Sequence, residues 1–313
     1  MTAPDVHLSD AEENIHTGYF DNSLEPVLSI ESGDVVAFEC RDAPNGHFDA
    51  DSTVADLEDK PDDGHPLTGP VRIAEAKPGD VLQIDLLDVQ HKGWGVSYFY
   101  PGRVEKGLLP EDFEKPGLHY WELDDDIGHF VDDITVPLDP FPGIVGVAPA
   151  ADGRHSSTPP RPVGGNLDCK HLTAGSTLYL PVEVDGALAS IGDGHAAQGD
   201  GEVCVTGIET PTEITAQFHV RTDLELSAPQ FTTEAPLSEP QSDFHATMGI
   251  ADDLRQAAKR AIRQMIDHLE SERGLSRSNA YILCSTAVDL KVTEVVNAPN
   301  WTVSAYLPET IFP

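Results

Sequence analysis

The side chains best suited to chemistry gather between residues 164 and 202. This segment opens with GGNLDCKHL (164–172) and closes with GDGHAAQGDGE (192–202). Four glycines interrupt the second run, and a glycine-rich backbone can approach a ligand or a metal ion closely. Loops of this kind on a rigid scaffold are common places for functional sites. The ionisable and nucleophilic residues of the segment are Asp168, Cys169, Lys170, His171, Asp193, His195, Asp200 and Glu202.

Two of these residues, Asp168 and His195, are candidate metal ligands. Carboxylate and imidazole groups suit zinc and other borderline divalent ions. Neither residue lies in a diagnostic spacing such as HExxH, so other interpretations stay open. Asp168 and Asp193 could bond their own backbone in turns, and His195 could be a hydrogen-bonded turn histidine. Glu202 could be a solvated carboxylate at the start of a strand.

A second group of polar residues follows the apolar run 35–40. Glu39 and Asp42 lie at the end of that run, and the sequence PNGHF (44–48) then predicts a turn. His47 and Asp49 could face the same site. His65 is ambiguous, and a structural role is favoured for it. Acidic residues are so abundant in this chain that no single one is strong evidence of function.

The elements that must position these residues are mostly strands. Leu82, Ile84 and Leu86 alternate with polar residues, which is typical of a half-buried strand. Gly, Asp and Pro turns separate the later runs, and this spacing suits an antiparallel sandwich. The strand-like runs are 35–40, 176–184, 187–192, 202–209, 213–220, 280–290 and 291–296, with LPETIF (307–312) at the end.

One segment is clearly helical. Apolar residues recur at helical spacing from Leu254 to Leu269, Asp252 and Asp253 precede them, and Gly274 is the expected C-cap. We therefore expect one long helix near 251–272. The expected organisation is a polar N-terminal arm (1–22), a β-sandwich core (23–225) and an α+β C-terminal part packed on that core (226–313). Residues 49–65 should form a solvated loop, and 101–140 an excursion outside the core.

Charge sets the limits on partners. The chain has 313 residues, with 54 Asp and Glu against 19 Lys and Arg, which gives a net charge of −35. Such a surface repels phosphate backbones and anionic membranes, so nucleic-acid and membrane binding are disfavoured. Together with only 8 Lys, the charge favours a protein adapted to concentrated salt, as in a halophile cytosol.

Several further features predict a cytoplasmic protein. The 4 cysteines are far apart and form no CxxC pair, so a disulfide framework is not expected. The N-terminal residues lack the pattern of a signal peptide, and no apolar run approaches the length of a membrane span. Exposed sheet edges make a homo-oligomer the expected assembly.

Four longer runs resemble the acetamidase/formamidase family. They are HPLTGPVRIAEAKPGDVL (65–82), GGNLDCKHLTAGSTLYLPV (164–182), GALASIGDGHAAQGDGEV (186–203) and GLSRSNAYILCSTAVDLKVTEVVNAP (274–299). The resemblance extends over residues 25–313, and residues 92–140 depart from it. It implies a jelly-roll-like antiparallel β-sandwich with an added α+β part. It also implies hydrolysis of short aliphatic amides with a divalent metal ion, for which zinc is the first candidate.

The resemblance also implies roles for individual residues. Asp168 and His195 would bind the metal, and Glu202 would transfer the proton of an activated water. Lys170 or a backbone N–H group would stabilise the oxyanion. The residues that we assign are, for catalysis, Glu202, Lys170 and Asp193; for the metal, Asp168 and His195; and for the small amide substrate, Asn166, Glu39, Asp42 and Gly194.

Two alternatives to a metal-dependent amidase remain. In the first, Cys169 is the nucleophile, helped by Glu202 and Lys170. In the second, the sandwich binds a small ligand or an ion and is not an enzyme. Sensitivity to chelators separates the metal-dependent mechanism from the thiol mechanism, and ammonia release separates both from a binding protein.

Overall fold

Alternation of apolar and polar residues produces the longest strands of the computed structural model, which describes residues 3–103, 106–234 and 243–313. In β17 (Thr212–Arg221), Ile214, Ala216 and Phe218 are fully buried and the residues between them are partly exposed. This pattern places one face of each strand against a core. The run expected at 213–220 is therefore confirmed as a strand.

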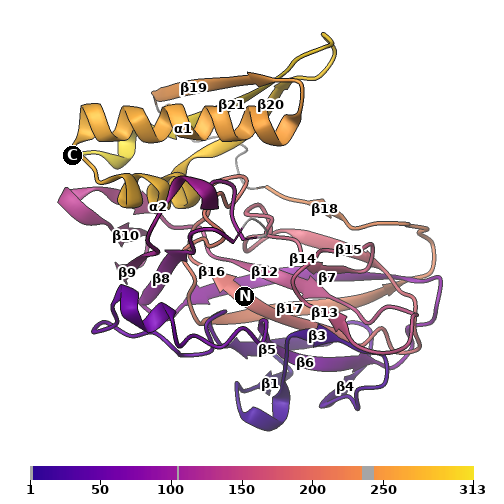
Figure 1. The fold of residues 1–313 in the computed structure, drawn as a ribbon. Helices are drawn as coiled ribbons and strands as arrows, with labels where there is room; N and C mark the ends of the chain where they lie inside the picture. Colours follow the sequence, from indigo (N-terminus) through magenta and orange to yellow (C-terminus); the bar gives the residue numbers. More distant parts are fainter. Residues whose placement is uncertain (1–2, 104–105, 235–242) are drawn as a thin grey trace.

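Two six-stranded sheets form a β-sandwich (Figure 1). The first has the order β1 (Val6–Leu8), β5 (Val35–Cys40), β17, β7 (Val81–His91), β15 (Thr177–Pro181) and β18 (Gln230–Thr232). The second has the order β14 (Gly164–Asn166), β12 (Phe141–Gly146), β16 (Ala189–His195), β6 (Pro66–Ile73) and β2 (Ile15–Thr17), with β4 (Leu28–Ile30) also paired to β6.

The core of the sandwich joins the inner faces of these two sheets. Phe38, Ile84 and Phe218 from the first sheet share a buried cluster with Val71 and Ile191 from the second. Burying these apolar faces is the main term that holds the two sheets together.

A second core lies between a four-stranded sheet and the C-terminal layer. The sheet has the order β11 (Thr135–Pro137), β10 (Ile127–His129), β9 (Gly117–Leu123) and β8 (Trp94–Phe99). Trp121 and Phe99 of this sheet share one buried cluster with Met265 and Leu283 of the C-terminal helices. Residues 101–140 thus contribute to a core, whereas the sequence had predicted an excursion outside it.

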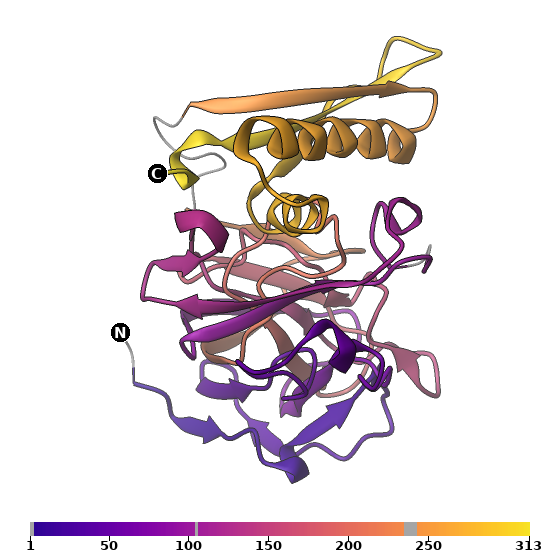
Figure 2. The ribbon, with the colours of Figure 1, turned by 60° about the vertical axis from the view of Figure 1, so that its left-hand side comes forward.

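The C-terminal layer is a three-stranded antiparallel sheet with two helices beneath it (Figures 1 and 2). Its order is β19 (Phe244–Ala251), β21 (Trp301–Pro308) and β20 (Asp289–Glu294). The long helix α1 (Leu254–Arg273) confirms the one predicted near 251–272. Asp253 caps it by accepting a hydrogen bond from the Gln256 N–H, and Gly274 ends it in the left-handed conformation.

Two predicted strands are wrong. Most of the run 280–290 lies in a second helix, α2 (Arg277–Ala287), which Ser276 caps by accepting a hydrogen bond from the Asn279 N–H. The first five residues of the run, 280–284, are continuously apolar, and such a short run fits a buried helix as well as a buried strand. The run 202–209 forms turns, because Glu202 and Val205 adopt positive φ angles that interrupt an extended chain.

The N-terminal residues contribute to both sheets of the sandwich, although the sequence predicted a polar arm there. β1 pairs in parallel with β5, and β2 pairs with β6. Short elements complete the fold: β3 (Tyr19–Phe20), β13 (His155–Ser156) and the 3-10 turns η1 (Glu12–Asn14), η2 (Val54–Leu57), η3 (Pro110–Asp112), η4 (Val131–Asp133) and η5 (Glu309–Ile311). Among the described residues, no helix combines the length and apolar character needed to span a membrane.

Candidate active site

Five ionisable residues converge where β16 ends. Asp193 and His195 are two residues apart on β16, so their side chains leave the same face of the strand. Glu202 and Glu209 come from the turns that follow, and the backbone of Glu209 forms an isolated bridge with that of His195. Asp168 comes from the loop after β14. The structure therefore brings together the four residues that the sequence singled out and adds Glu209.

His195 is the centre of this cluster. Its Nε2 atom lies 3.0 Å from Glu209 Oε1 and 3.5 Å from Glu202 Oε1. Donor atoms of Asp168, Asp193 and His195 lie within 4.8 Å of one another. The imidazole is fully buried and stacks on the Phe141 ring, with 5.0 Å between ring centroids. The cluster is therefore largely shielded from water.

The loop that carries Asp168 is held by backbone hydrogen bonds. The Gly143 carbonyl of β12 accepts hydrogen bonds from the N–H groups of Leu167 and Asp168, at 2.9 and 3.1 Å. The Gln198 side chain donates a hydrogen bond to the Asp168 carbonyl at 2.9 Å. These contacts fix the position of Asp168 relative to β16.

Burial and mutual repulsion perturb the acids of the cluster. Burial raises the pKa of Asp168, and the Glu202 carboxylate raises it further. Burial also raises the pKa of Asp193 and Glu202. For His195, burial alone would lower the pKa, but the carboxylates of Glu209 and Asp193 raise it. Four carboxylates thus surround one imidazole, and this imbalance favours either bound protons or a bound cation.

The residues present fit a divalent cation. Asp168 Oδ1, Asp193 Oδ1 and both ring nitrogens of His195 are buried and have no hydrogen-bond partner among the described residues. A Cβ atom on Gly143 would lie 2.8 Å from both Asp168 Oδ1 and His195 Nδ1, so the glycine leaves space beside these two atoms. Carboxylate and imidazole donors of this kind suit zinc and similar ions.

The backbone is strained at three of these residues. The φ angles of Asp168, Asp193 and Glu202 are 44°, 57° and 41°, in the left-handed region that non-glycine residues rarely adopt. Each such residue costs about 1–3 kcal/mol, and residues of this kind concentrate at functional sites. The strain supports a functional interpretation of these acids over ordinary turn chemistry.

Three further predicted residues, Asp42, Glu39 and Lys170, make contacts of their own. Asp42 is buried, its Oδ1 accepts a hydrogen bond from the Gly46 N–H at 2.7 Å, and burial raises its pKa to about 6, with a contribution from Glu209. Glu39 instead pairs with His7, with 3.4 Å between Oε1 and Nε2. The Lys170 ammonium contacts the Asp289 carboxylate.

Asn166 and Gly194, which were also predicted to bind substrate, differ in how closely they are packed. Asn166 is half-buried in β14, and its Oδ1 has no hydrogen-bond partner among the described residues. Gly194 is packed tightly, because a Cβ atom there would lie 2.4 Å from Cγ2 of Thr212. Gly194 thus allows β16 to approach Thr212, whereas the side-chain oxygen of Asn166 is buried without a partner among the described residues.

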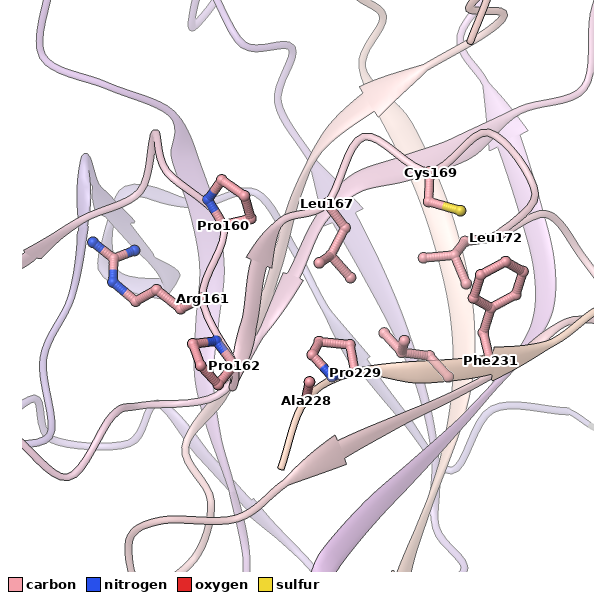
Figure 3. Close-up of a pocket in the computed structure, with 10 residues that line it drawn as sticks. Pro160, Arg161, Pro162, Leu167, Cys169, Leu172, Ala228, Pro229 and Phe231 are labelled. Atoms are coloured by element: carbon pink, nitrogen blue, oxygen red, sulfur yellow. The ribbon is translucent and has the colours of Figure 1, made fainter. Parts of the chain in front are cut away.

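Cys169 faces an apolar pocket of about 500 Å³. Figure 3 shows its sulfur beside Leu172 and Phe231, and Leu167 also lines this pocket. Burial raises the pKa of the Cys169 thiol. Asp168, which lies between Leu167 and Cys169, instead joins the ionisable cluster. A high pKa and an apolar environment both oppose thiolate formation.

Sequence reasoning missed Glu209, and it favoured a structural role for His65, which lies beside Asp193. His65 Nε2 lies 4.0 Å from Asp193 Oδ2, its Nδ1 lies 3.0 Å from Ser157 Oγ, and burial lowers its pKa to about 4. Nothing in the sequence distinguishes Glu209 from the many other acids.

Comparisons with known proteins give one family. The model of the Acetamidase/Formamidase family matches residues 3–158 and 150–313. A candidate formamidase of Schizosaccharomyces pombe is 30% identical over 266 residues, or 65% of this chain and 64% of that protein. The chain therefore spans less than two thirds of the length of that relative.

Solved structures extend the comparison to nearly the whole chain. An acetamidase from Bacillus halodurans is 33% identical, with a TM-score of 0.69, and the match covers 96% of this chain and 97% of that one. A gamma lactamase from Delftia acidovorans is 24% identical, with a TM-score of 0.90, and the match covers 98% of this chain and 93% of that one. This last match shows that the two proteins share a fold.

Proposed function

The chain belongs to the acetamidase/formamidase family, and from this premise we propose that it hydrolyses short aliphatic amides to a carboxylate and ammonia. The observation that carries the proposal is the buried cluster of four carboxylates around His195. The names of the S. pombe and B. halodurans relatives support small linear amides as the substrate class.

We place a divalent metal ion, with zinc as first candidate, between Asp168 and His195, with Asp193 as a third nearby donor. When bound, such an ion lowers the pKa of water and polarises an amide carbonyl. The unpartnered donor atoms and the space left by Gly143 support this assignment. Glu209, 3.0 Å from His195 Nε2, orients the imidazole.

Glu202 is proposed as the proton carrier. It lies 3.5 Å from His195 Nε2, and burial raises its pKa, which brings it closer to the range useful for proton transfer. Its carboxylate takes a proton from the attacking water and delivers it to the amide nitrogen as the C–N bond breaks. Because Lys170 contacts Asp289, we assign oxyanion stabilisation to a backbone N–H group.

Ammonia release tests this proposal directly. The protein is incubated with formamide, acetamide and propionamide in molar KCl, before and after chelation and after addition of Zn²⁺. We expect ammonia release that falls on chelation and returns with the metal ion. Turnover that survives complete chelation would favour the thiol mechanism, and the absence of ammonia from every amide would favour a binding protein. Cytoplasmic location and homo-oligomeric assembly stay predictions.

A further inference from the structure

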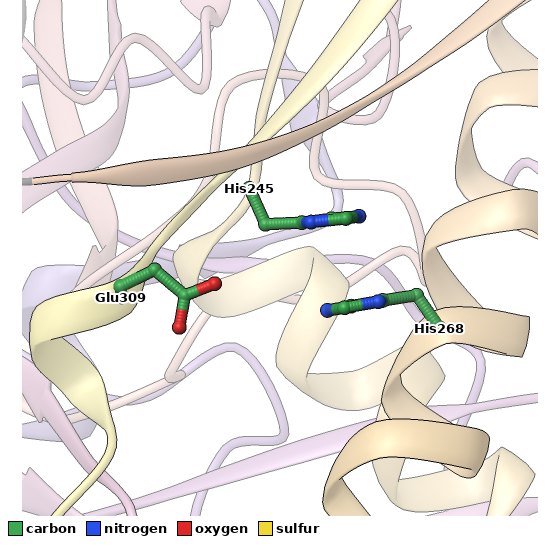
Figure 4. A group of neighbouring side chains, drawn as sticks. All are labelled: His245, His268 and Glu309. Carbon is green, nitrogen blue, oxygen red and sulfur yellow. The ribbon is translucent and has the colours of Figure 1, made fainter.

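A second group of potential metal ligands lies in the C-terminal layer (Figure 4). It consists of His245 at the start of β19, His268 near the end of α1 and Glu309 at the start of η5. His245 pairs with Leu307 in β21, two residues before Glu309. Three elements thus bring their donor atoms within 4.8 Å of one another.

The two imidazoles are stacked face to face. Their ring centroids are 3.5 Å apart and their planes differ by 4°. Burial lowers the pKa of His268, and His245 lowers it further. Neutral imidazole is the form that binds metal ions, and burial favours that form of His268.

Two observations indicate that donor atoms of this group are free to bind a ligand. His268 Nε2 is buried and has no hydrogen-bond partner among the described residues. The Glu309 carboxylate contacts the Arg273 guanidinium, which also lies 3.9 Å from the centroid of the Phe312 ring. Arg273 therefore keeps a partner if Glu309 turns toward an ion. A buried ring nitrogen without a partner is an unfavourable feature that a ligand would relieve.

We propose that His245, His268 and Glu309 bind a borderline divalent ion such as Zn²⁺. Ligands about 2.0–2.2 Å from a tetrahedral ion are about 3.4 Å apart, so these donors must approach one another by about 1–1.5 Å. Rotation of the imidazoles about χ2 supplies part of this movement and turns their edges toward a common point. The flexible Glu309 side chain supplies the rest. The bound ion ties β19, α1 and η5 together and stabilises the C-terminal layer.

This site is independent of the active-site cluster, because the two share no residue. The full-length protein is titrated with Zn²⁺ by calorimetry in molar KCl, and its thermal unfolding is followed with and without Zn²⁺. We compare wild type with His268→Asn, Glu309→Gln and Asp168→Asn. His129→Asn is the matched control, because His129 also pairs with a carboxylate (Nε2 is 2.8 Å from Asp124 Oδ2) but forms no such group with the other described residues.

We expect His268→Asn to bind one Zn²⁺ fewer than wild type and to lose the Zn²⁺-dependent rise in unfolding temperature. Glu309→Gln should weaken that same site at least tenfold, which keeps the test valid if His268→Asn folds poorly. Asp168→Asn and the control should retain the site. Unchanged stoichiometry and affinity in both His268→Asn and Glu309→Gln would overturn the proposal, as would an equal loss in the control. Failure of active-site metal binding would appear separately, as no difference between wild type and Asp168→Asn.

Discussion

At the scale of single residues, the two ring nitrogens of His195 face different acids. Nε2 lies near Glu209 and Glu202, whereas Nδ1 and Asp168 Oδ1 both flank the space beside Gly143. Metal binding and proton transfer are thus assigned to different residues around the same ring. Variants of these residues should therefore have different effects.

His195→Ala and Glu202→Gln test this separation. His195→Ala should purify with depleted metal, because it removes one of few protein ligands. Glu202→Gln should keep its metal and bind amide, but turn over about 10²–10⁴ times more slowly, as expected for loss of a proton carrier. Elemental analysis beside steady-state kinetics decides between the roles. Full metal content and near-normal kcat in His195→Ala would refute the assignment, and metal loss in Glu202→Gln would make Glu202 a ligand.

The Cys169→Ala variant tests the thiol alternative. Cys169 faces an apolar pocket and burial raises its pKa, so little thiolate forms near neutral pH. We expect kcat/KM to stay within a few-fold of wild type, whereas bulky alkylation of Cys169 should impair activity by displacing the Asp168 loop. Loss of several orders of magnitude in the alanine variant, with metal still bound, would support a thiol nucleophile.

The sequence predicted four members of the cluster but not the fifth. Asp168, Asp193, His195 and Glu202 lie within or beside glycine-rich runs that were recognisable as a possible site. Glu209 has no such context, and its role depends on a backbone bridge to His195 that only the folded chain forms. Where 54 residues are acidic, a single glutamate carries little information.

At the scale of elements, β12 and β16 position the cluster, and Gly143 is the point of closest approach. A Cβ atom at this position would lie 2.5 Å from Cε1 of His195. We expect Gly143→Ala to lower metal content and to reduce kcat/KM by about 10²-fold, because displacement of ligands by about 1 Å has effects of this size.

Gly128→Ala in β10 is the matched control for Gly143→Ala. A Cβ atom at Gly128 would meet only side-chain carbons, such as Leu123 Cδ2 at 3.2 Å and Leu138 Cδ2 at 3.3 Å. These side chains can adjust, so activity should be close to wild type. Equal activity in the two variants would show that the space beside Gly143 has no functional role.

His119 in β9 makes stability depend on pH. Its ring packs against Trp121 and Phe130 at centroid distances of 4.7 and 4.4 Å, and burial lowers its pKa to about 4. The unfolded chain takes up a proton on His119 below about pH 6.5, so stability is lost as the pH falls from about 6.5 to about 4.

His119→Phe should remove this part of the pH dependence. Phenylalanine keeps the aromatic packing and cannot titrate. The unfolding free energy of the variant relative to wild type should therefore rise by up to about 3 kcal/mol between pH 7 and pH 4. Chemical denaturation of both proteins across this range measures the difference. Parallel curves would show that His119 is not kept neutral by burial.

Periodicity predicted strands better than it predicted short buried helices. Runs 35–40 and 213–220 alternate or are bounded by turn residues, and they form β5 and β17. Residues 280–286 are buried on every side because α2 is enclosed by α1 and by β8 and β9. The length and composition of the run 280–290 suit a strand equally well, and only its packing partners decide the outcome.

At the scale of the whole molecule, the two largest buried clusters lie in different parts of the fold, one inside the sandwich and one beneath the C-terminal layer. The sandwich core and the core beneath the C-terminal layer share none of their buried members. Residues 92–140 departed from the family pattern, yet β8 and β9 contribute Phe99 and Trp121 to the core beneath the helices, and Val96 of β8 forms a backbone bridge with Glu209. These contacts could not be predicted, because they join distant segments.

The last prediction concerns the effect of salt on stability and follows from the net charge of −35. Even if every Lys and Arg paired with an acid, 35 carboxylates would remain, and their repulsion weakens as the Debye length falls from about 10 Å at 0.1 M salt to about 3 Å at 1 M. The urea midpoint of unfolding should therefore rise steeply between low salt and 1 M KCl. A double variant, Glu58→Gln and Glu225→Gln, removes two exposed acids and should show a higher midpoint at low salt and a smaller rise. A midpoint that does not change with KCl would show that adaptation to salt is not the reason for this charge.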